Sequence, residues 1–133
     1  MSVEENKDLV KRYFEGISGK DKPMELIEKY VSGEGLKELI AFGETAFPRF
    51  ELIAEDMIAE GDLVAVRATT KCIHKGDFLG IPGTGKHISQ PFCIFYRIAD
   101  GKIAEEWIGI NRLEMMQQIG VLPEDLSELV KKD

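Results

Sequence analysis

The sequence predicts an α+β domain in which N-terminal helices pack on one side of an antiparallel sheet. Apolar residues recur at helical spacing up to Pro48. Beyond Pro48, apolar and polar residues alternate as in strands with one buried face, and short turns separate these segments. Helices followed by consecutive strands are typical of α+β domains, and a chain of 133 residues has the size of one such domain.

Three helices are predicted before Pro48. The first begins at Ser2, which forms a capping-box pattern with Glu5. The second carries Pro23 in its first turn, and the third opens after Gly33 and is stopped by Pro48. Their apolar faces consist of Leu9, Val10, Tyr13, Phe14 and Ile17, then Met24, Leu26, Ile27 and Tyr30, and finally Leu36, Leu39, Ile40 and Phe47.

The second half of the chain predicts four strands, at residues 50–59, 63–74, 87–98 and 102–110. Asp100-Gly101 is a two-residue hairpin signal between the last two strands. Residues 75–86 contain four glycines and are predicted to form a loop. A helix is predicted over residues 111–119, and residues 123–130 form either a last short helix or a frayed tail.

Charge and hydropathy exclude several classes of partner. The formal net charge is −7, and no basic stripe offsets the repulsion of phosphate groups, so we expect no nucleic acid and no anionic membrane as a partner. No apolar run approaches the roughly 20 residues of a membrane helix. The acidic start of the chain is unlike the basic start of a signal peptide, so a cytoplasmic location is expected.

Metal and nucleotide sites are not predicted. The chain has two histidines, no HxH or HExxH motif and no clustered acidic loop, so we expect neither a metal nor a cofactor. The glycines of residues 80–85 lie between strands and lack a following helix to bind phosphate. Cys72 and Cys93 lie on opposite faces of the predicted sheet, so we expect two buried free thiols rather than a disulfide.

Four segments of the chain match landmarks of one family, in the same order. Residues 74–86, HKGDFLGIPGTGK, match the loop pattern T-H-x-G-x-F-x-G-I-P-x-T-G-K. Residues 95–107, FYRIADGKIAEEW, are similar to I-F-R-x-x-D-G-K-I-x-E-H-W. Residues 33–37 and 46–48 correspond to G-P-E-G-L and A-F-P. In these segments the sequence resembles the SnoaL-like polyketide cyclase family.

The resemblance implies a single domain over residues 1–133, with a core of about 5–122 and a C-terminal tail of 123–133. It implies the cone of the nuclear transport factor 2-like superfamily, in which three N-terminal helices pack on a strongly curved antiparallel sheet and enclose a deep pocket. Such domains are commonly homodimers through the convex face of the sheet. The cyclases of the family close a ring by intramolecular aldol condensation, without metal or cofactor, using an aspartate in the triplet H-W-D.

The chain departs from the family at that aspartate. The triplet stands here as Glu106-Trp107-Ile108, and Ile108 can neither give nor take a proton. Strand alternation places Glu106 on the face of Ile108, where burial among apolar side chains would raise the pKa of its carboxyl group. We therefore expect Glu106 as the replacement catalytic carboxyl group and His74, at the end of its strand, as its partner.

The candidate substrate-binding residues share the face that the resemblance assigns to the pocket. They comprise a phenol donor, an amide and three apolar side chains, namely Tyr13, Gln90, Phe92, Ile94 and Ile108. Such a lining predicts a largely apolar small-molecule ligand.

Each candidate also has a plainer explanation. Glu106 is either in the pocket or solvated at its mouth, and His74 either acts on a ligand or only hydrogen-bonds its own loop. Phe78 and Ile81 either cover the pocket or fix the loop. Three functions therefore stay open: a cofactor-free acid/base enzyme acting on a carbonyl compound, aldol cyclase-like or isomerase-like; a non-catalytic binding or carrier module; and a dimeric scaffold without a ligand.

Overall fold

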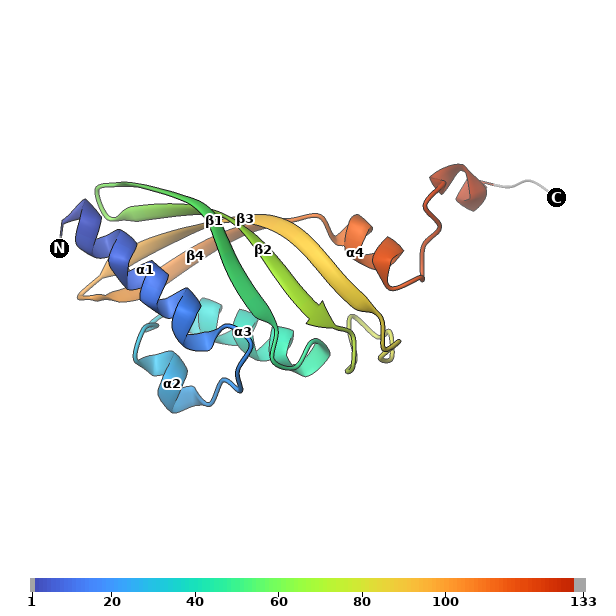
Figure 1. The fold of residues 1–133 in the computed structure, drawn as a ribbon, viewed down its shortest axis with the longest axis horizontal. Coiled ribbons are helices and arrows are strands. Elements are labelled where there is room, and N and C mark those ends of the chain that lie inside the picture. Colours follow the sequence, from blue (N-terminus) through green and yellow to red (C-terminus); the bar gives the residue numbers. More distant parts are fainter. Residues whose placement is uncertain (1, 131–133) are drawn as a thin grey trace.

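The computed structural model describes residues 2–130, and its helices precede a four-stranded sheet as the sequence predicts (Figure 1). The helices before the sheet are α1 (Val3–Ile17), α2 (Met24–Glu28) and α3 (Glu34–Ala46). The strands are β1 (Glu51–Glu60), β2 (Leu63–Ile73), β3 (His87–Ala99) and β4 (Lys102–Ile110). The chain continues through α4 (Arg112–Gln118) to a short 3₁₀ helix, η1 (Leu126–Val130).

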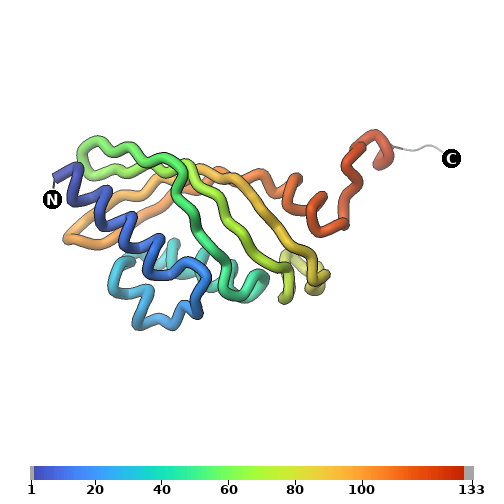
Figure 2. Tube along the Cα trace, in the orientation of Figure 1, coloured from blue at the N-terminus to red at the C-terminus, as the bar shows by residue number. Residues whose placement is uncertain are grey.

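The start of α1 has the predicted capping box. The Glu5 backbone N–H donates to Ser2 Oγ over 3.1 Å, and the Ser2 backbone N–H donates to Glu5 Oε1 over 3.0 Å. These two hydrogen bonds satisfy backbone donors that a helix start leaves unpaired. At the other end of the chain, η1 stands away from the body of the domain, with Val130 exposed (Figures 1 and 2).

The sheet is an antiparallel meander in the order β1-β2-β3-β4. Asp100 and Gly101, at the β3–β4 turn, both have positive φ angles of 51° and 73°, the conformation that a two-residue hairpin needs. The ladder shifts register between Ala54 and Asp56 in β1. Such bulges bend a strand, and the sheet curves around the helices on its concave side (Figure 1).

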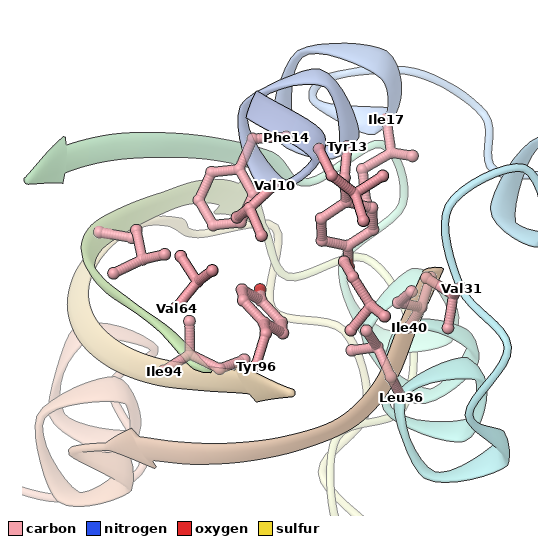
Figure 3. Close-up of a cluster of buried hydrophobic side chains, with 14 of the residues drawn as sticks. Val10, Tyr13, Phe14, Ile17, Val31, Leu36, Ile40, Val64, Ile94 and Tyr96 are labelled. Atoms are coloured by element: carbon pink, nitrogen blue, oxygen red, sulfur yellow. The ribbon is translucent and has the colours of Figure 1, made fainter. Parts of the chain in front are cut away.

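The main core lies between the concave face of the sheet and α1 to α3 (Figure 3). Alternate residues of β3 are buried, and they are Ile88, Gln90, Phe92, Ile94, Tyr96 and Ile98. Helix α1 contributes Leu9, Val10, Tyr13, Phe14 and Ile17 to the same core. The apolar face of α1 and the buried face of β3 therefore pack against each other, as the helical and strand periodicities of the sequence predict.

A second apolar cluster closes the far end of the sheet. It joins the end of α3, the 74–86 loop and α4 through Ala46, Phe47, Phe78, Ile88, Met115 and Ile119. The backbone N–H groups of Lys75 and Gly76 both donate to the Ala46 carbonyl, over 3.1 and 3.0 Å. Phe78 is 2% exposed, so this side chain fixes the loop to the domain.

A backbone contact fixes the connection between α2 and α3 to β4. Val31 forms an isolated parallel bridge with Ile103, and the Ser32 backbone N–H donates to the Ile103 carbonyl over 2.9 Å. A Cβ atom on Gly33 would collide with the Ala104 carbonyl oxygen, so only glycine fits this close approach.

The convex face of the sheet is open and partly apolar. It carries Ile58, Phe95 and Trp107, which are 72%, 50% and 47% exposed. Cys93 lies on this face and is exposed, so the expectation that it is buried is wrong, because its strand position turns it away from the helices. Cys72 and Cys93 are both free thiols. Within residues 2–130, no helix is long and apolar enough to span a membrane.

Candidate functional site

A cavity of about 130 Å³ lies between α3 and the concave face of the sheet. Helix α3 supplies Leu36, Leu39, Ile40 and Phe42, and the strands supply alternate residues of their inner faces. Phe42 and Ile108 are 37% and 39% exposed, so the cavity opens to solvent between α3 and β4. Its walls are almost entirely apolar, as in sites that bind apolar small molecules.

Four of the candidate binding residues line this cavity: Tyr13, Phe92, Ile94 and Ile108. The last three are brought together by strand register, because Phe92 pairs with Ile110 and Ile94 pairs with Ile108 across the β3–β4 ladder. Side chains directly opposite in an antiparallel pair lie on one face. Tyr13 reaches the same cavity from α1.

Two buried phenols meet at the inner end of the cavity. The rings of Tyr13 and Tyr96 are 1% exposed, and they pack edge to face with centroids 5.9 Å apart (Figure 3). Burial raises the pKa of both hydroxyl groups above the ordinary value for tyrosine, and the nearby Glu106 carboxylate raises both pKa values further. Both phenols are therefore neutral hydrogen-bond donors at pH 7.

Glu106 lies beside these phenols, just outside the lining of the cavity. It stands opposite Tyr96 in the β3–β4 register and is half-buried. Its Oε1 atom lies 3.6 Å from the position that a Cβ atom on Gly35 would occupy, so the first turn of α3 covers it. Burial raises the pKa of this carboxyl group. It is close enough to the inner end of the site to act electrostatically on both phenols.

His74 is completely buried but lies away from Glu106. Its Nδ1 atom accepts a hydrogen bond from the Thr84 backbone N–H over 3.3 Å and lies 3.0 Å from Thr84 Oγ1. Nε2 has no hydrogen-bond partner within residues 2–130, and the ring packs against Phe47 and Phe78.

The sheet register separates the two catalytic candidates. Tyr96 pairs with both Glu106 and Val64, so ten residues of β2 run between the level of Glu106 and His74. That distance is about 30 Å along a strand. The structure therefore does not bring Glu106 and His74 together, and His74 does not line the cavity.

Gln90 lies under α4 rather than in the cavity. Its amide donates to Glu114 Oε2 over 2.8 Å and accepts from Gln118 Nε2 over 2.8 Å. Glu114 and Gln118 both belong to α4, so these two hydrogen bonds of the buried Gln90 amide hold α4 against β3. The structure brings Tyr13, Phe92, Ile94 and Ile108 together and leaves Gln90 outside their group.

Sequence reasoning missed several lining residues. Tyr96 has the same strand parity as Phe92 and Ile94, so alternation alone could have found it. Cys72 also lines the cavity, and burial raises the pKa of its thiol to about 11. Arg112 lines the cavity from the first residue of α4, where no periodic pattern marks it.

No metal centre accompanies the cavity in the part of the chain that is described. Residues 2–130 contain no group of three His, Cys, Asp or Glu side chains placed to hold a metal ion. The arrangement of polar groups can bind a ligand oxygen through the phenols and exchange a proton through Glu106.

Comparison with known proteins identifies the fold and the family. The model of the SnoaL-like polyketide cyclase family matches residues 6–119. AclR from Streptomyces galilaeus, provisionally assigned as a hydroxylase, is 28% identical with a TM-score of 0.78, over 97% of this chain and 89% of AclR. A provisionally assigned SnoaL-like polyketide cyclase from Jannaschia sp. CCS1 is 27% identical with a TM-score of 0.75, over 90% of this chain and 94% of that protein. No protein of curated function matches the sequence. The chain belongs to the SnoaL-like polyketide cyclase family.

Proposed function

We propose that the chain is a cofactor-free acid/base enzyme that binds a small, largely apolar carbonyl compound and converts it through an enolate. One observation carries the proposal. At the inner end of a largely apolar cavity, a carboxyl group with a raised pKa lies just outside the lining, beside two neutral, buried phenols that line it. A base whose pKa approaches the working pH and a donor for developing negative charge are the two groups that enolate chemistry needs.

Each group has a definite role in the proposed step. Glu106 removes a proton from the carbon next to the carbonyl group, and the C–H electron pair becomes the double bond of the enolate. The carbonyl oxygen takes the negative charge and accepts a hydrogen bond from the Tyr13–Tyr96 pair. Where a β,γ double bond extends the enolate to a dienolate, Glu106 returns the proton to the γ-carbon. Where the compound carries a second carbonyl group, the α-carbon of the enolate attacks it, and the oxygen of that group takes the proton. The first outcome is an isomerisation and the second an aldol closure.

The position of Glu106 explains how chemistry survives without the family aspartate. Ile108 stands where the resemblance places that aspartate, and it lines the cavity. Glu106 is two residues earlier on β4 and on the same face, next to the phenols. The reacting carbonyl group would lie against Tyr96, one step deeper than in the family pattern.

Hydrogen exchange at carbon tests this proposal. β-Tetralone in D₂O loses its α-protons by enolisation, which NMR follows directly. We expect the wild type to accelerate this exchange and Glu106→Gln to lose about 100-fold or more of the acceleration. Glu105→Gln is the matched control, because Glu105 pairs with Arg97 over 3.0 Å on the opposite face. A panel of such ketones would refute the acid/base proposal if wild type and Glu106→Gln gave equal exchange, or if neither accelerated it.

A non-catalytic binding module is the second candidate. It is favoured by the lining itself, in which Phe92, Ile94 and Ile108 present only hydrocarbon, and by the position of Glu106 outside the lining. In that case apolar ketones would stabilise the protein against heat without any acceleration of proton exchange.

We also propose that the chain forms a homodimer through the convex face. This face exposes Ile58, Phe95 and Trp107, which lie in one cross-strand row on β1, β3 and β4, with Ala65 of β2 between Ile58 and Phe95. Large exposed apolar patches in soluble proteins commonly mark interaction surfaces. The cavity lies on the opposite side of the sheet, so a partner on this face leaves its mouth open.

A further inference from the structure

Arg112 is the one charged residue among those that line the cavity. It is the first residue of α4 and follows β4 after a single cap residue, Asn111. Its side chain is exposed, so the guanidinium group stands at the mouth, where the apolar wall meets solvent. An arginine can keep its charged end in water while its hydrocarbon stem lies against an apolar surface.

Arg112 is also the one arginine without an acidic partner in residues 2–130. Arg12, Arg49, Arg67 and Arg97 each form an ion pair with an aspartate or glutamate. The chain has 24 acidic residues, yet none of those described lies within ion-pair distance of Arg112. A guanidinium group presents paired N–H donors that fit a carboxylate, and at Arg112 these donors are available to a ligand.

The cavity has two polar regions, the guanidinium group of Arg112 and the Tyr13–Tyr96 phenols. They lie at opposite ends of an apolar wall. Arg112 follows Ile110, which pairs with Phe92, whereas the phenol of Tyr96 is four residues further along β3. Four residues of a strand span about 13 Å. A compound with a polar group at each end and a hydrocarbon body between them fits this spacing.

We propose that Arg112 binds the carboxylate of the ligand, so that the site prefers apolar keto acids to neutral ketones. This inference deepens the proposed function and rests on its ligand-binding cavity. The net charge of −7 repels anions from the molecule as a whole. A preference for an acid over its ester must therefore come from a local cation, and Arg112 is the cation on the wall.

Binding of a matched acid and ester tests the inference apart from catalysis. We would titrate naphthylacetate and its methyl ester into wild type and variants by calorimetry. The wild type is expected to bind the acid roughly tenfold more tightly than the ester, a difference of about 1.4 kcal/mol. Arg112→Gln should bind both equally, and Arg112→Lys should restore part of the preference, since a lysine keeps the charge without the paired donors. Arg12→Gln is the control, because it removes the same charge from an exposed position of α1.

The outcomes separate the two proposals. Ester and acid binding equally to the wild type, or a preference that persists in Arg112→Gln, would overturn the role of Arg112 and leave the cavity in place. Failure of both compounds to bind would overturn the role of Arg112 together with the ligand cavity. Loss of the preference in Arg112→Gln supports the inference whether or not Glu106→Gln changes proton exchange, because binding is read without turnover.

Discussion

The ammonium group of Lys22 lies 2.7 Å from the Glu44 carboxylate, and the Lys22 side chain has no exposed surface. The same Nζ atom donates to the carbonyl groups of Lys20 and Phe50 over 2.9 and 3.0 Å. It also lies 4.0 Å from the centre of the Phe50 ring, within the range of a cation–π contact. One ammonium group thus fastens the loop after α1 to the end of α3 and the start of β1, beside the cavity wall that Phe50 helps to form.

Lys22→Met is expected to destabilise the fold by about 2–4 kcal/mol, because it removes the cation that pairs with the partly buried Glu44 carboxylate, together with two hydrogen bonds to carbonyl groups. Urea unfolding followed by circular dichroism measures this change. Arg12→Met is the control, since its ion pair with Asp8 is exposed and should contribute less than about 0.5 kcal/mol. Equal losses in the two variants would show that the Lys22 cluster is no stronger than a surface pair.

The raised pKa of Glu106 gives the proposed reaction a defined pH dependence. The carboxyl group must be ionised to act as a base, so exchange of β-tetralone should fall as pH drops through its raised pKa. The acid limb should therefore lie above the ordinary glutamate value of 4.5. Rates in deuterated buffers across this range measure it. Glu106→Gln should show no such limb, and a limb that persists in this variant belongs to another group.

The raised pKa of Glu106 also predicts whether Glu106→Gln is more or less stable than the wild type. Because burial favours the protonated form of Glu106, ionisation opposes folding, and this loss develops as pH rises from the unfolded pKa through the folded pKa. Glu106→Gln should therefore be more stable than wild type at pH 7, and the difference should vanish below about pH 4. Thermal unfolding of both proteins at the two pH values provides the comparison. A Gln variant less stable at pH 7 would mean that the carboxylate has a stabilising partner.

Local periodicity predicted the helices, the strands and part of the lining, and tertiary packing decided the rest. Strand parity grouped Phe92 with Ile94 and Glu106 with Ile108, because alternate residues of a strand point to the same side, and the family resemblance assigned that side to the pocket. The same parity cannot say what covers an inward side chain. Gln90 faces inward but meets α4. His74 lies behind Phe47 because the 74–86 loop folds onto the end of α3, which no repeat in the sequence encodes.

The two cysteines should differ sharply in reactivity. Cys93 is exposed on the convex face, whereas the pKa of the Cys72 thiol is raised to about 11 by burial. At pH 8 only about one Cys72 in a thousand is the reactive thiolate. Iodoacetamide treatment of the folded protein, diluted until the proposed dimer dissociates and followed by mass spectrometry, should label Cys93 alone. Labelling should disappear in Cys93→Ser and persist in Cys72→Ser. If Cys72 were labelled before Cys93, the cavity would have to open far more than the structure indicates.

Gly33→Ala should destabilise the contact between β4 and the connection from α2 to α3. The new methyl group would collide with the Ala104 carbonyl oxygen, and neither backbone can yield without breaking the bridge between Val31 and Ile103. We expect a loss of about 2 kcal/mol or more in urea unfolding. Gly109→Ala is the control, because its methyl group would meet only the Cys93 carbonyl oxygen, at an ordinary 3.8 Å.

The proposed dimer predicts a specific response to charge on the convex face. Trp107 pairs with Phe95 across β3 and β4, and both rings are about half exposed. Trp107→Lys places like charges opposite each other if two such faces meet around a twofold axis, and their burial without partners costs several kcal/mol. Sedimentation velocity should therefore show a dimer for the wild type and a monomer for Trp107→Lys. Leu129→Lys changes a more exposed apolar residue, on η1, and should leave the dimer intact. A wild type that sediments as a monomer at high concentration would remove the dimer, and it would leave the cavity on the other face of the sheet as the site to test.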